Sequence, residues 1–156
     1  MNVNSSENLP ELEKRYRTTV LIVLAQIFFV LILIAASFLL ALRVETTLQD
    51  YTTLWVGVLF IAVGSFILRR MFFTWERLKT VAILKGVSGV LGTLQRNSII
   101  LSVFGLLVGI FGYLISLFSG SGFDMLRAGA IALVVFLINF PRKKVWKTIV
   151  SNLEKV

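Results

Sequence analysis

Apolar positions along this chain gather into long runs, which shorter polar segments separate. Three of these runs, of 25, 18 and 27 residues, contain no charged residue, and a fourth apolar run has 14 residues. A helix rises about 1.5 Å per residue, so about 20 apolar residues cross the ~30 Å hydrocarbon core of a bilayer. The pattern predicts four membrane-spanning helices, at residues 18–42, 51–68, 97–119 and 123–141.

The first run also invites a signal-peptide interpretation, because basic residues precede it and small residues occur at Ala35, Ala36 and Ser37. Its 25 residues exceed the apolar region of a signal peptide, and residues 38–42 stay apolar beyond the small ones. We therefore expect an uncleaved span.

The fourth run, residues 128–141, is too short to cross alone, since 14 residues reach only about 21 Å. A crossing helix must begin near Phe123, with Asp124 and Arg127 paired at i, i+3 near the boundary. A re-entrant segment is the alternative.

Small residues recur through the third span at spacings of 4, 3, 4, 3 and 4. Without a hydrophobic force between helices in lipid, small residues allow neighbouring backbones to approach closely. We expect this helix to be the one around which the others pack, with crossing angles of about +20°. The first and fourth spans are its expected neighbours, and the second span is expected to reach it through a face of its own that contains Gly57 and Gly64. The small-residue seam consists of Ser98, Ser102, Gly105, Gly109, Gly112 and Ser116.

Three polar segments flank the spans. Residues 1–17 have Leu9, Leu12 and Tyr16 at helical spacing, which predicts an extension of the first span with a loose tail, or else a segment that docks a partner. Residues 69–96 and 142–156 read as basic amphipathic segments at the membrane surface. Their predicted contacts to anionic lipid or a partner are Arg69, Arg70, Arg77, Lys79, Arg142, Lys143, Lys144 and Lys147.

The charge pattern also orients the chain. The three flanking segments carry net charges of 0, +5 and +4, whereas the two short loops between spans together carry −1. Because an excess of Lys and Arg marks the cytoplasmic side, both termini and residues 69–96 are predicted to be cytoplasmic.

Composition narrows the classes of function. The chain of 156 residues is 57% hydrophobic and 15% charged, and it contains neither Cys nor His. Disulfides, thiol nucleophiles, imidazole bases and Cys/His metal sites are thereby excluded, and no cofactor or metal is expected. The net charge of +8 lies beside the apolar runs, which favours anionic headgroups over nucleic acid as its partner.

Few residues within the predicted spans could catalyse a reaction or bind an ion, because no ionisable residue lies at mid-depth. The most informative polar pair is Gln26 and Ser102, which lie at similar depths on two helices of the same direction. We expect an interhelical hydrogen bond between them; contact with a ligand or ion is the alternative. Neither Glu76 nor Asp124 has a second carboxylate or base at useful spacing, so an enzyme is not expected.

The sequence therefore predicts an all-α integral membrane protein with four transmembrane helices, arranged as two in-out-in hairpins, plus basic amphipathic segments on the cytoplasmic side. A non-catalytic accessory, assembly or anchoring subunit is expected, which binds other membrane subunits or itself. The alternative is a small oligomeric channel or transporter with the small-residue seam at a pore or dimer axis.

Overall fold

The computed structural model describes residues 5–41 and 52–153, and this part of the chain consists of helices joined by short turns. Four of its helices are long and apolar enough to cross a membrane, which confirms the predicted all-helical class. The helices are α1 (Ser5–Ala41), α2 (Thr52–Phe72), α3 (Trp75–Ser119), α4 (Gly122–Asn139) and α5 (Lys143–Leu153). The expected loop 43–50, the start of the second span and both chain ends lie outside the described residues.

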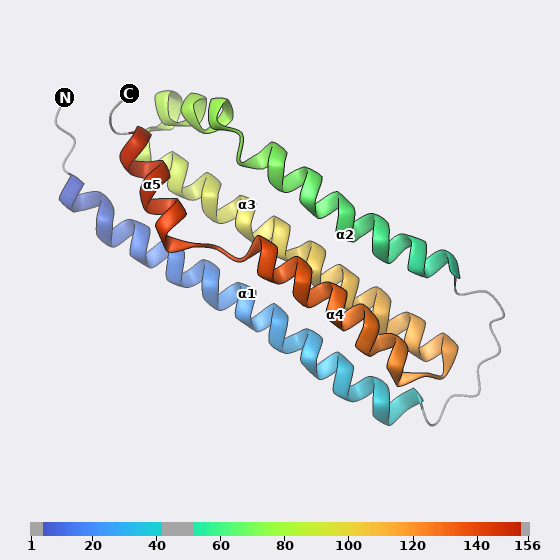
Figure 1. The fold of residues 1–156 in the computed structure, drawn as a ribbon. Helices are drawn as coiled ribbons and strands as arrows, with labels where there is room; N and C mark the ends of the chain where they lie inside the picture. The colour runs from blue at the N-terminus through green and yellow to red at the C-terminus, as the bar shows by residue number, and fades with distance from the viewer. Residues whose placement is uncertain (1–4, 42–51, 154–156) are drawn as a thin grey trace.

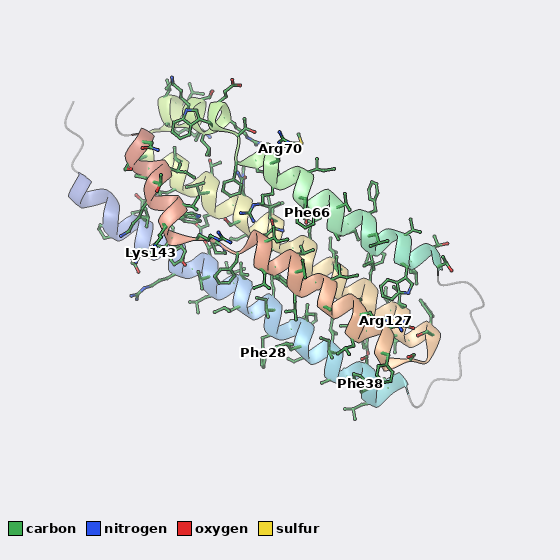
Figure 2. All side chains as sticks on the ribbon, viewed as in Figure 1. Phe28, Phe38, Phe66, Arg70, Arg127 and Lys143 are labelled. Atoms are coloured by element: carbon green, nitrogen blue, oxygen red, sulfur yellow. The ribbon has the colours of Figure 1, made fainter. Side chains whose placement is uncertain are left out.

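The long helices lie roughly along one axis (Figure 1). The start of α1, the start of α3 and all of α5 gather at one end of the bundle, which we call the basic end, and the α3–α4 turn lies at the other. Successive long helices therefore run in opposite directions, as the predicted order of the spans requires. Figure 2 shows Arg70 and Lys143 toward the basic end and Arg127 near the opposite end.

Helix α3 is the centre of the bundle. It packs against α4, α1 and α2, while α1 and α2 lie on opposite flanks of the α3–α4 pair (Figure 1). The core along the spans includes Val30 of α1, Val58 of α2, Val108 of α3 and Phe136 of α4. Consecutive position in the chain therefore does not make α1 and α2 a packed hairpin, whereas α3 and α4 do form one.

Helix α3 is broken near its start. Gly86 has φ 65° and ψ −171°, a region of backbone conformation that is essentially restricted to glycine. The first part of α3 therefore turns away from the remainder, as the upper helical segment in Figure 1 shows. Beyond the break, the helix continues without interruption from the basic segment into the third apolar run.

The α3–α4 turn is short and sharply defined. Gly120 adopts the left-handed conformation (φ 67°) that commonly ends a helix. Helix α4 begins at Gly122, and the Arg127 guanidinium contacts the Asp124 carboxylate at 3.3 Å. This i, i+3 pair forms as expected. Helix α4 runs alongside α3 rather than turning back, so it lacks the form of a re-entrant segment (Figure 1).

Candidate functional site

All six residues of the small-residue seam are buried. A Cβ atom added at Gly105 would lie 3.0 Å from the Phe136 ring, and one at Gly109 would lie 2.7 Å from a Val30 methyl group. At Gly112 the added atom would meet the Ala128 side chain. The seam is therefore filled by residues of α1 and α4 from the same chain.

The expected hydrogen bond between Gln26 and Ser102 is absent, which corrects that prediction. The Ser102 hydroxyl donates instead to the Ile99 carbonyl oxygen at 2.8 Å, and Gln26 Oε1 is buried without a hydrogen-bond partner. Register explains the difference. Val30 faces Gly109, so seven residues earlier Val23 is level with Ser102, and Gln26 lies about one helical turn further along.

A second hydrophobic cluster holds the basic end together. Trp146 of α5 is 1% exposed and packs in a cluster with Leu12 of α1 and Leu91 and Leu94 of α3. The Tyr16 and Trp146 rings meet edge to face, with 5.8 Å between their centroids. The apolar face of the tail was expected to lie along headgroups. That face packs on the protein instead, because the extensions of α1 and α3 provide an apolar surface nearby.

Polar contacts also join the helices of the basic end. The Ser88 hydroxyl and the Arg15 guanidinium each donate to a Glu11 carboxylate oxygen at 2.9 Å, and Lys143 pairs with Glu13. Glu11 lies before the charge-free run of α1. The hydrogen bond from Ser88, and to a smaller extent the one from Arg15, holds the pKa of the Glu11 carboxyl below its usual range. These contacts tie α1 to both α3 and α5.

Most of the basic side chains predicted to contact lipid or a partner are exposed at the basic end, and the Arg77 guanidinium lies 5.3 Å from the centre of the Phe72 ring. Two differ from the rest. Lys143 is half-buried and paired with Glu13, and Arg69 is half-buried at the end of α2. The exposed ones are Arg70, Arg77, Lys79, Arg142, Lys144 and Lys147.

Arg69 lines a cavity of about 210 Å³ between α2, α3 and the link from α4 to α5. Arg142, Asn139 and Ser98 contribute further polar groups to its wall. The sequence offers one signal for this site, a lone amide at Asn139 two residues before Pro141, at the end of an apolar run. That signal does not reveal which charged residues lie nearby.

Catalytic and metal-binding groups do not converge in the structure. Within residues 5–41 and 52–153, no three Asp, Glu, His or Cys residues lie close enough to hold a metal ion. Glu76 belongs to the first turn of α3 and Asp124 to the first turn of α4, at opposite ends of the bundle (Figure 1). The two carboxylates therefore do not act as a pair.

The four long apolar helices place the chain among multi-pass helical membrane proteins. Comparison with protein-family models, with curated proteins and with solved structures finds no match. The class is thus defined by the fold and its closed core, and a more specific function has to be inferred from the surface and the basic end.

Proposed function

We propose that the protein is a non-catalytic integral membrane subunit, an accessory, assembly or anchoring component that binds other membrane proteins, with both termini in the cytoplasm. The observation that carries the proposal is the sparse burial of α2. Of its 21 residues, Val58, Ala62 and Ser65 are buried, and they form a narrow stripe at spacings of 4 and 3. The outward side of α2 offers an apolar surface to lipid and to helices of a partner, and it includes the exposed side chains of Val56, Leu59, Phe60, Val63 and Ile67.

The open surface of α2 suits a helix partner in particular. Phe60 is 80% exposed, and a Cβ atom added at Gly64 would meet nothing within 4 Å. The prediction that this helix reaches α3 through a face of Gly57 and Gly64 is therefore wrong for Gly64. An unfilled glycine beside apolar side chains allows another helix to approach closely, which favours helix association in lipid.

The channel or transporter alternative has less support. In that alternative the small-residue seam lies at the pore or dimer axis. The space beside the seam glycines is already occupied by side chains of the same chain, those of Val30, Phe136 and Ala128. No specific feature of the described residues favours transport over assembly.

The test is photo-crosslinking in native membranes, with a benzophenone amino acid replacing Phe60 of α2. Phe28 of α1 is a matched control, since it is 65% exposed and lies on the outer side of the opposite flank (Figure 2). We expect a discrete adduct from position 60 that mass spectrometry assigns to another membrane protein. Adducts to lipid alone, or a lone homodimer that exchanges ions in liposomes, would contradict the proposal.

A further inference from the structure

The cavity beside Arg69 contains polar groups that the protein leaves without partners. Asn139 is 5% exposed, and both its Nδ2 and its Oδ1 atoms are buried without a hydrogen-bond partner. The Nη1 atom of Arg69 is buried in the same state. Buried polar groups are costly to leave unsatisfied, and nearly all in native proteins are paired. Three such atoms on one cavity indicate a ligand.

The charge of the cavity indicates that the ligand is an anion. Arg69 and Arg142 both line it, and neither forms an ion pair with any described residue. Helix α5 starts at Lys143, directly after Arg142, so the unpaired N–H groups of its first turn add positive potential beside the cavity. Guanidinium groups and helix N-termini are both suited to phosphate oxygens.

Asn139 restricts the ligand further. Its Nδ2 atom can donate to a phosphate oxygen, but its Oδ1 atom can only accept, so the ligand must also carry a hydroxyl or ammonium donor. The remaining wall includes the apolar side chains of Leu101, Phe140 and Trp146. We propose that this cavity binds a phosphate ester with a hydrogen-bond donor beside the phosphate, held by Arg69, Asn139 and Arg142.

Two sources could supply this chemistry: the headgroup of a glycerophospholipid or a soluble phosphate ester. The position of the cavity suits a headgroup, because Arg69 follows directly after the charge-free run of α2 and Pro141 ends that of α4. The inference does not depend on the proposed role as an assembly subunit, since it concerns a ligand of the chain itself.

The test compares ligand-induced thermal stabilisation of the full chain in an uncharged detergent. The probes are phosphatidylglycerol, phosphatidylcholine, whose headgroup lacks a donor, and glycerol 3-phosphate without lipid. We expect phosphatidylglycerol to raise the unfolding midpoint more than phosphatidylcholine. Arg69→Gln should weaken its binding by about tenfold or more, as expected for a lost charge-assisted hydrogen bond. Lys14→Gln also removes one positive charge, but from an exposed side chain outside the cavity, and should change binding less than about twofold.

Asn139→Leu gives a second readout that a purely structural role would not produce. Without ligand, this variant should unfold at a higher temperature than the wild type, because it removes two unsatisfied buried atoms. Its stabilisation by phosphatidylglycerol should be largely lost. An Arg69-dependent response to glycerol 3-phosphate but not to lipid would support the site and assign it to a soluble ester. Equal loss in the Arg69 and Lys14 variants, or full lipid stabilisation of Asn139→Leu, would overturn the proposal.

Discussion

Single residues set the closeness of helix packing in this protein. At Gly109, the facing Val30 side chain leaves no space for a larger residue, whereas Gly64 faces open space on α2. A side chain larger than glycine is therefore excluded at position 109 and accommodated at position 64. Substitutions at these glycines separate packing from helix propensity, because both positions are within helices and both gain propensity when glycine is replaced.

We expect Gly109→Leu to lower the free energy of unfolding by about 1–3 kcal/mol, since it overpacks the contact with Val30. Gly64→Leu is the matched control and should be neutral or slightly stabilising. Unfolding in SDS mixed with a mild detergent would measure both. Equal tolerance of the two substitutions would show that Gly109 does not face α1.

Gly86 has a conformational role rather than a packing role, because an added Cβ atom there would meet nothing within 4 Å. Its φ of 65° with ψ near 180° strains any other residue, so Gly86→Ala should destabilise the protein by about 1–3 kcal/mol. Thermal unfolding in detergent measures this, with Gly64→Ala as the control in a regular helix. A stabilised Gly86→Ala variant would mean that α3 is continuous in the protein.

At the scale of elements, the long helices combine two environments. Helix α1 carries charged residues in its first turns and an uncharged run after them, and α3 likewise carries its charged residues up to Arg96 and none from Asn97 onward. The charged parts meet α5 in the cluster around Trp146, and the uncharged parts meet α4 around the small-residue seam. Each long helix therefore joins the two packed regions.

Trp146 should be the residue on which the position of α5 most depends. Trp146→Ala removes a side chain that is 1% exposed, and the loss of its packing should cost about 3–5 kcal/mol in the basic end. Limited proteolysis should then cut within α5 faster than in the wild type. Val145→Ala, at an exposed neighbouring position, serves as the control and should leave the rate unchanged. Equal protection of both variants would contradict the packing of α5 on α1 and α3.

At the scale of the whole molecule, orientation follows from charge. The ends of the bundle differ, since the basic end contains Arg70 and Lys143 while the α3–α4 turn has the single pair of Asp124 and Arg127 (Figure 2). A membrane-impermeant thiol reagent can test the orientation cleanly, because the chain has no cysteine of its own. Single substitutions to cysteine at Ser121, Thr80 and Ser151 sample the two ends.

On intact cells, we expect labelling at position 121 and protection at positions 80 and 151, because an excess of basic residues retains a segment in the cytoplasm. Permeabilised cells provide the control, in which all three positions should react. Labelling at position 80 or 151 on intact cells would reverse the predicted orientation.

The sequence by itself determined the class of fold and the number of long apolar helices. Both depend on properties that are local in the chain: the length of an apolar run, the absence of charge within it, and the flanking basic residues. The spacing of small residues from Ser98 to Ser116 likewise marked α3 as a packing surface, because a helix repeats every 3.6 residues.

The tertiary structure alone decided which side chains meet. The register of α1 against α3 places Val23, rather than Gln26, level with Ser102, and a displacement of one turn is enough to remove a predicted hydrogen bond. The folding of α5 onto Leu12 and Leu94 and the cavity shared by Arg69 and Asn139 both join residues far apart in the chain. Such contacts depend on the relative rotation and translation of packed helices, which no periodicity within one segment specifies.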